Sequence, residues 1–274
     1  MTTCSQEWAE LSAYGTAPVA RFWLAIEQPG PWGRDAFTQS RLDPALGAAL
    51  SARCSAAGGK ALLLRHPASH AAVDGPRRVF LAGGGDAPWL LSGTVDDPEV
   101  LLGLDLDQPG PPSVPWLTTQ RDPVLLVCSN GRRDRCCATL GRGVAGALEA
   151  RFPGQVYECS HLSGHRFAAT AVVLPLGHVV ARLDDALGGE ILDAAADGRL
   201  AAGALGPRHD RGRAHLSPED AAAESATRFA HGDTAVPPGP GARVAVRRRA
   251  AQGPLAESCG GDPLPVWVWE PAPQ

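Results

Sequence analysis

The stretch that decides the fold of this chain is VLLVCSNGRRDRCC, residues 124–137. Its first four residues are apolar, which is typical of a strand buried on both faces. A loop rich in arginine then runs from Cys128 to Cys137. Residues 138–152 place their apolar side chains at helical spacing. The stretch therefore predicts a strand, a loop and a helix in that order.

The residues that follow complete one unit of helices and strands. Residues 156–159 predict a second strand. Residues 165–176 and 178–183 predict two more strands around a turn at Gly177, and residues 184–196 predict a helix. A strand–helix–strand unit followed by a strand pair and a helix is the order of a thioredoxin-like fold, a mixed sheet with helices on its faces.

The first part of the chain repeats this order of elements without the cysteines. Residues 22–26 and 61–64 predict strands on either side of a helix. That helix begins with Asp43 as N-cap and Pro44 as its first residue. Two strands and a short helix are expected next, at residues 79–82, 89–92 and 97–104. We interpret this part as a degenerate thioredoxin-like half.

A proline-rich segment separates the halves, and further elements follow the second half. Ser217 and Pro218 predict the start of a helix, and residues 266–269 predict a last strand that pairs with residues 243–246. We predict an α/β fold with two tandem thioredoxin-like halves, mixed sheets flanked by helices, and a C-terminal helix and strand extension. The expected boundaries are 1–108 for the first half, 109–120 for the linker, 121–235 for the half with the cysteine loops and 236–274 for the extension.

The bulk composition excludes several classes of function. The chain has 274 residues and a formal net charge of −4, so neither nucleic acid nor an anionic membrane is expected as a partner. No window of about 18 apolar residues occurs, so no membrane span is expected. Residues 1–7 lack the basic and apolar regions of a secretory signal. We therefore expect a cytoplasmic protein.

The cysteines suggest metal or redox chemistry. There are seven, and an odd number without a secretory signal argues against a disulfide framework. Cys128, Cys136 and Cys137 lie within ten residues of one another, which in a reducing compartment indicates a metal or a redox site. The others are expected to be structural or incidental, namely Cys4, Cys54 and Cys259, with Cys159 in the core.

A second loop supplies two histidines at close spacing. His161 and His165 lie in CSHLSGHRF, residues 159–167, between two strands. In a thioredoxin-like layout this loop and the loop from Cys128 to Cys137 emerge at the same end of the sheet. Two thiolates and two imidazoles can hold either a tetrahedral zinc ion or a [2Fe–2S] cluster. The residues alone leave the metal open, and a Rieske pattern is excluded because each loop supplies one type of ligand.

Together, the two loop motifs resemble those of the sucrase/ferredoxin-like family. Its members include thioredoxin-like ferredoxins with a bis-histidinyl, non-Rieske [2Fe–2S] cluster. The resemblance implies that Cys128, Cys137, His161 and His165 hold such a cluster, with Cys136 as the substitute for Cys137. The thioredoxin-like ferredoxin half would then be the second one.

The remaining charged and histidine side chains have plainer interpretations. Arg133 and Arg166 could donate hydrogen bonds near the cluster and raise its potential, or could pair with Asp134 as ordinary loop ties. The histidines without cysteine neighbours are interpreted as surface or core residues: His66, His70, His178, His209, His215 and His231.

The resemblance implies an electron carrier rather than an enzyme, acting with redox partner proteins that the sequence does not identify. A ligating imidazole keeps one ring nitrogen that can titrate, so we expect proton-coupled one-electron transfer and a reduction potential that depends on pH. One alternative is a thiol-redox protein that uses either the adjacent pair Cys136–Cys137 or Cys128, although no Cys-x-x-Cys motif is present. Another is a zinc-stabilised binding module. A sucrose hydrolase is rejected because no spacing singles out a pair of carboxylates.

Overall fold

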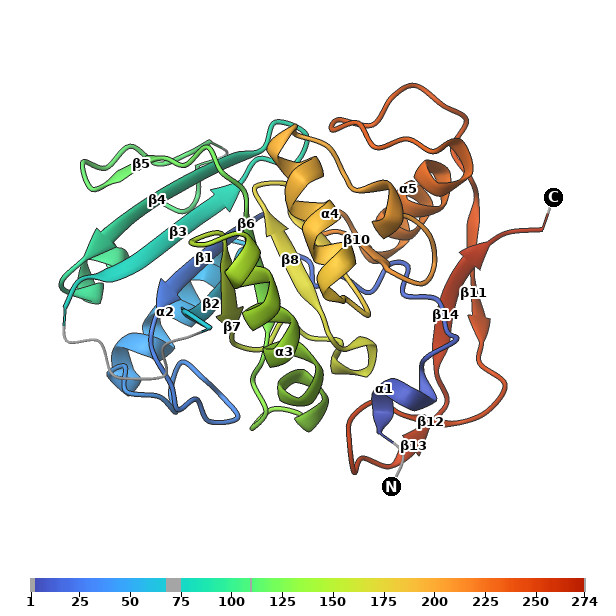
Figure 1. Cartoon of the computed structure of the whole chain (residues 1–274), viewed down its shortest axis with the longest axis horizontal. Coiled ribbons are helices and arrows are strands. Elements are labelled where there is room, and N and C mark those ends of the chain that lie inside the picture. The colour runs from blue at the N-terminus through green and yellow to red at the C-terminus, as the bar shows by residue number, and fades with distance from the viewer. Residues whose placement is uncertain (1–2, 68–74, 109, 274) are drawn as a thin grey trace.

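A single ten-stranded mixed sheet runs through the chain (Figure 1). The computed structural model describes residues 3–67, 75–108 and 110–273. The strand order across the sheet is β10-β9-β8-β6-β7-β2-β1-β3-β4-β5. The bounds are β1 Phe22–Glu27, β2 Lys60–Arg65, β3 Arg77–Gly83, β4 Trp89–Val95, β5 Leu117–Thr119, β6 Val124–Cys128, β7 Val156–Cys159, β8 Ala171–Leu174, β9 His178–Val180 and β10 Asp210–Arg213.

Each half of the sheet has the same topology. In the first half β1 pairs parallel with β2 and antiparallel with β3, and β3 pairs antiparallel with β4. In the second half β6 pairs in the same way with β7 and β8, and β8 pairs antiparallel with β9. Helix α2 (Pro44–Ala56) connects the parallel strands of the first half, and α3 (Arg135–Arg151) connects those of the second. The thioredoxin-like α/β fold predicted from the sequence is confirmed.

The two halves join edge to edge through β2 and β7. These strands pair antiparallel, with Leu64 opposite Cys159 and Arg65 opposite Glu158. The pairing satisfies backbone donors and acceptors that each half would otherwise leave open at its edge. The sequence suggested one mixed sheet in each half, whereas the structure has one continuous sheet. Neither edge strand carries a proline that would block the pairing.

A buried ion pair lies at the junction of the halves. Nη2 of Arg65 is 2.5 Å from Oε2 of Glu158, and the two side chains are 6 % and 2 % exposed. The Ser129 hydroxyl donates to the same carboxylate oxygen at 2.6 Å. The Arg65 guanidinium also lies 4.3 Å from the ring centroid of Trp32. These contacts tie the first half to the loop that follows Cys128.

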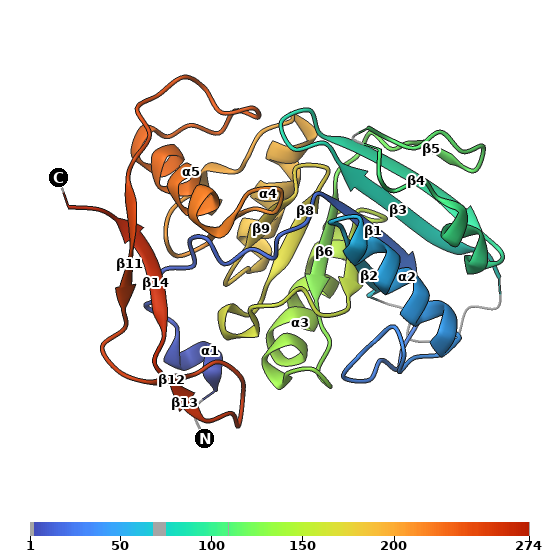
Figure 2. The same cartoon turned by 180° about the vertical axis from the view of Figure 1, so that it is seen from behind.

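Three apolar cores cover the faces of the sheet. Helix α2 packs on first-half residues such as Leu24 and Leu63, while α3 and α4 (Asp185–Ala196) pack on the second half. Figure 1 shows α3 and α4 in front of the second-half strands, and Figure 2, from behind, shows α2 with the first half. Alternate strand residues from both halves form the third core, which also contains Cys128 and Cys137. The 3₁₀ helices are η1 Pro98–Gly103, η2 His165–Phe167 and η3 Ala202–Ala204.

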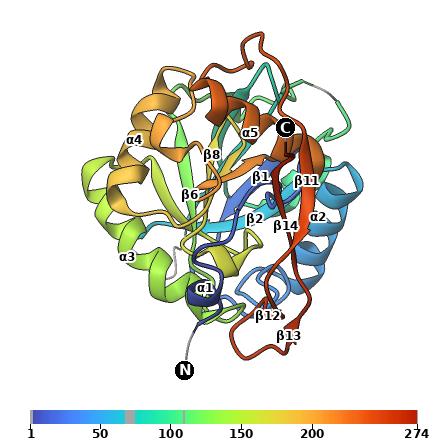
Figure 3. The same cartoon turned by 90° about the vertical axis from the view of Figure 1, so that its right-hand side faces the viewer.

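Helix α1, near the N-terminus, lies beside β12 and β13 from the C-terminal part of the chain, next to the second half (Figure 3). The indole Nε1 of Trp8, just after α1, donates to the carbonyl oxygen of Ala256 in β12 at 3.0 Å. Strand β11 pairs antiparallel with β14, slightly further along the chain than the sequence predicted. The bounds are α1 Cys4–Glu7, β11 Val246–Ala250, β12 Leu255–Ala256, β13 Pro263–Leu264 and β14 Trp267–Pro271.

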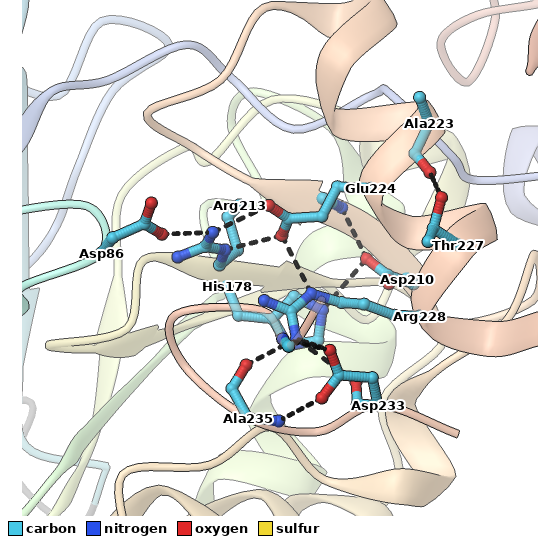
Figure 4. A network of polar contacts seen from close by, with 12 residues as sticks. Asp86, His178, Asp210, Arg213, Ala223, Glu224, Thr227, Arg228, Asp233 and Ala235 are labelled. Atoms are coloured by element: carbon cyan, nitrogen blue, oxygen red, sulfur yellow. Dashed lines mark hydrogen bonds and ion pairs between the residues drawn. The ribbon is translucent and has the colours of Figure 1, made fainter. Parts of the chain in front are cut away.

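Helix α5 (Pro218–His231) is anchored to the sheet by a buried polar network (Figure 4). The Glu224 carboxylate lies between two arginines that are each 1 % exposed, 2.7 Å from Nε of Arg213 and 3.0 Å from Nε of Arg228. Nearby, His178 Nε2 lies 3.0 Å from Oδ1 of Asp210. The network joins α5, β9 and β10 through charged and polar side chains.

Three further expectations concern segments away from the cysteines. Within the segment expected to be a linker, Leu117–Thr119 form β5 and pair with β4. His70 lies outside the described residues. Among the helices of the described ranges, none is both long enough and apolar enough to cross a membrane.

Candidate metal centre

Cys128 and Cys137 meet where β6 ends and α3 begins. Cys128 is the last residue of β6, Cys137 lies in the first turn of α3, and both are fully buried. Asp134 caps the helix, because its Oδ1 accepts a hydrogen bond from the Cys136 amide at 2.9 Å. Gly141 lets the helix approach the strand, since a Cβ at this position would collide with the carbonyl oxygen of Cys128.

The loop between β7 and β8 supplies His161 and His165. Gly164 adopts a left-handed conformation, with φ of 68°, and the 3₁₀ turn His165–Phe167 follows it. A Cβ on Gly164 would collide with the guanidinium of Arg211. The strand predicted over residues 165–176 is therefore wrong at its start, because the backbone turns at Gly164 and β8 begins only at Ala171.

Three of the four predicted ligands converge. The Sγ atoms of Cys128 and Cys137 and one ring nitrogen of His161 all lie within 4.8 Å of one another. The Cys128 Sγ is 3.9 Å from Nδ1 of His161. His165 stands beside this group, with its ring centroid 5.3 Å from that of His161.

His165 has the environment of a side chain that lacks its partner. Both ring nitrogens are buried, and neither has a hydrogen-bond partner among the described residues. The Oδ2 of Asp134 lies 3.6 Å from Nε2, which is too far for a hydrogen bond. Burial lowers the pKa of His165 below its usual 6.5, although Asp134 opposes the change. A partly buried imidazole whose ring nitrogens make no hydrogen bond within the described ranges fits a metal ligand, because coordination would supply the missing bond.

The pKa values of the two thiols shift in opposite directions. The hydrogen bond between them lowers the pKa of Cys128 well below the usual 9.0 and raises that of Cys137. Cys128 is therefore the thiol that more readily becomes a thiolate, the form that binds metals. Two thiols and two imidazoles are donors that suit iron–sulfur clusters and zinc, so the residues present fit either group.

Cys136 faces away from this group. Its Sγ lies 3.6 Å from that of Cys4 and 3.1 Å from that of Cys259. Neighbouring residues on an α-helix point about 100° apart, so only one of the two adjacent cysteines can face Cys128. The structure brings Cys137, and not Cys136, together with Cys128 and His161.

The two arginines named from the sequence lie near the site without contacting the candidate ligands. Arg133 is exposed and lines a surface cavity with His161. Arg166 pairs with Glu257 at 3.4 Å and lies 4.7 Å from the ring centroid of Trp8. Within the described ranges, neither guanidinium donates to a candidate ligand or pairs with Asp134.

Arg211 is the positioning residue whose role the sequence did not indicate. It is fully buried, and it donates to the carbonyl oxygen of Ser163 at 3.2 Å and to the hydroxyl of Thr16 at 3.1 Å. Burial lowers its pKa to about 9. No local pattern in the sequence connects Arg211 to the histidine loop.

Comparison with known families bears on both loops. The family described as Sucrase/ferredoxin-like has a model that matches residues 13–200, more than half of the 274 residues. The chain belongs to the sucrase/ferredoxin-like family. This confirms the resemblance drawn from the loop motifs, and the matched range contains all four candidate ligands. The searches of curated proteins and of solved structures found no match.

Gly141→Ala should separate α3 from β6 at the candidate site. The added methyl group meets the Cys128 carbonyl oxygen, so we expect the free energy of unfolding to fall by about 1–3 kcal/mol in urea denaturation. Gly146→Ala is the matched control, because nothing lies within 4 Å of an added Cβ at that exposed position of the same helix. It should stabilise the protein by about 0.5–1 kcal/mol. Equal effects of the two substitutions would contradict the close packing at Gly141.

Proposed function

We propose that this protein is a one-electron carrier in which Cys128, Cys137, His161 and His165 hold a [2Fe–2S] cluster. The observation that carries the proposal is the convergence of two thiols and one imidazole within 4.8 Å, beside a second imidazole whose buried ring nitrogens have no hydrogen-bond partner among the described residues. Membership of the sucrase/ferredoxin-like family supports it. When bound, the cluster would supply reversible one-electron chemistry at a raised potential, because neutral imidazoles replace two charged thiolates.

The surrounding residues give the site a buried side and an accessible side. Both thiols are fully buried, whereas the two histidines are only partly buried. His161 also lines a surface cavity with Arg34 and Arg133. We propose that electrons pass through the histidine side to a redox partner protein. The exposed arginines on this side would favour a partner with an acidic docking surface.

Proton coupling is part of this proposal. An imidazole that binds through one nitrogen keeps a second nitrogen that can hold or release a proton. Because the histidines lie on the accessible side, water can exchange protons with them more readily than with the buried part of the site. The reduction potential should therefore fall as pH rises through the titration of the ligating imidazole.

Substituting each histidine by cysteine tests the ligand assignment. His161→Cys and His165→Cys should each keep iron, change the visible spectrum and lower the reduction potential, because a thiolate is more negative than an imidazole. His231→Cys is the control, since His231 is exposed and belongs to neither candidate group. A redox titration followed by absorbance measures the effect. If the visible spectrum and the reduction potential are unchanged in both variants, the histidines are not ligands.

A further inference from the structure

Three cysteines from distant parts of the chain gather in a second group. Cys4 lies in α1, Cys136 in the first turn of α3, and Cys259 in the turn between β12 and β13. The Sγ–Sγ distances are 3.6 Å for Cys4–Cys136, 3.5 Å for Cys4–Cys259 and 3.1 Å for Cys136–Cys259. Cys4 and Cys136 are each 1 % exposed, and Cys259 is partly buried. None of the three belongs to the group of Cys128, Cys137 and His161, and Cys136, the substitute ligand expected from the sequence, lies here instead.

The spacing of the sulfurs is that of ligands around one ion. A tetrahedral ion with Zn–S bonds of about 2.3 Å holds its sulfurs about 3.8 Å apart. A disulfide would bring two sulfurs to about 2.05 Å and leave the third thiol unpaired. Two of the distances here, 3.6 Å and 3.5 Å, lie near the tetrahedral value, and the third, 3.1 Å, is shorter but still far longer than a disulfide bond. The arrangement therefore fits a shared ion better than a bond between two of the cysteines.

Asp134 supplies a fourth donor. One of its carboxylate oxygens and the three sulfurs all lie within 4.8 Å of one another. The amides of Cys136 and Cys259 donate to its Oδ1 and Oδ2 at 2.9 Å and 2.8 Å, so the carboxylate is fixed among the thiols. Each oxygen keeps a further lone pair that could bind a cation. The group thus offers four protein ligands, the number typical of a closed structural site.

We propose that Cys4, Asp134, Cys136 and Cys259 form a structural site for a thiophilic divalent cation, best matched by zinc. Thiolates select soft and borderline metals, and zinc accepts a carboxylate as its fourth ligand. The bound ion would fasten α1 and the turn around Cys259 to the start of α3, directly beside Cys137. This site uses different thiols from the proposed cluster, so it can be tested independently of the proposed function.

Metal analysis of the full chain tests the proposal. Protein purified without oxygen with its iron in place, then incubated with Zn²⁺ and dialysed, should hold one tightly bound zinc ion per chain. Cys4→Ala and Cys259→Ala should each lose that zinc and leave any iron in place. Cys54→Ala, at a buried cysteine of α2 outside both groups, should change neither metal. Cys137→Ala should lose iron and keep zinc, which separates the two sites.

Cobalt provides a second readout. Co²⁺ bound in place of zinc should show thiolate-to-metal charge transfer and the intense visible bands of a tetrahedral site, and Cys4→Ala should lose both. Circular dichroism checks that each variant is folded. If Cys259→Ala does not fold, the loss of zinc in Cys4→Ala alone tests the site. Zinc that all these variants retain equally would overturn the proposal. A zinc-free protein whose mass is two hydrogens lower, reversed by a reductant, would overturn it in favour of a disulfide.

Discussion

Replacing Glu224 by Gln should lower the free energy of unfolding by about 3 kcal/mol. The Glu224 carboxylate pairs with Arg213 and Arg228, each of which has only 1 % of its side chain exposed. Removing its charge leaves two buried guanidinium groups undercompensated, which is costly in a medium of low polarity. Asp86 and Asp233 still face these arginines, so the expected loss is at the lower end of the usual range for a broken buried pair. Urea denaturation followed by circular dichroism measures it.

A control and a pH series make the Glu224 prediction specific. Asp220→Asn breaks the exposed pair with Arg243 and should leave the free energy of unfolding nearly unchanged. Burial alone would raise the pKa of Glu224, but the hydrogen bond and charge of Arg213 hold it below the ordinary 4.5. The charge of Glu224 therefore stabilises the fold fully above its ordinary pKa of 4.5. This stabilisation is lost as the pH falls through the lower pKa that Glu224 has in the folded protein. The difference in the free energy of unfolding between wild type and Glu224→Gln should therefore decrease on acidification. A difference that stays constant with pH would contradict the proposed role of the Glu224 charge.

Cys137→Ala should abolish iron binding, whereas Cys136→Ala should leave it intact. The two residues are adjacent, but only Cys137 faces Cys128 and His161. The substitutions are chemically identical, so a difference in iron content reports the direction of the side chain and not a general effect of losing a thiol. Iron and acid-labile sulfide are counted in protein purified without oxygen. Equal iron loss in both variants, or loss only in Cys136→Ala, would contradict the assignment.

Much of the fold follows from patterns that are local in the sequence. The apolar run at residues 124–127 and the helical spacing after Cys137 predict β6 and α3, and their repetition around Asp43 predicts the first half. The joining of the halves does not follow from such patterns. It depends on the pairing of β2 with β7, which lie far apart in the chain and show no local preference for each other. The early start expected for the strand at residue 165 failed because Gly164 turns the backbone.

For the candidate site too, one part can be predicted from the sequence and another cannot. The two loops could be expected at one end of the sheet from the element order alone, and three predicted ligands do converge there. Which of the two adjacent cysteines faces Cys128 depends on the rotation of α3, which its packing at Gly141 sets. The grouping of Cys4 with Cys259 depends on a contact between the two ends of the chain. No local spacing indicates this grouping, and the sequence predicts only structural or incidental roles for Cys4 and Cys259.

The most direct test of the central claim is the metal and sulfide content of wild-type protein purified without oxygen, together with its visible spectrum. With a [2Fe–2S] cluster on these ligands, we expect a brown protein with two irons and two labile sulfides per chain, whose colour bleaches on one-electron reduction. A colourless protein without iron, or one in which zinc occupies the site and is lost in Cys137→Ala, would contradict it.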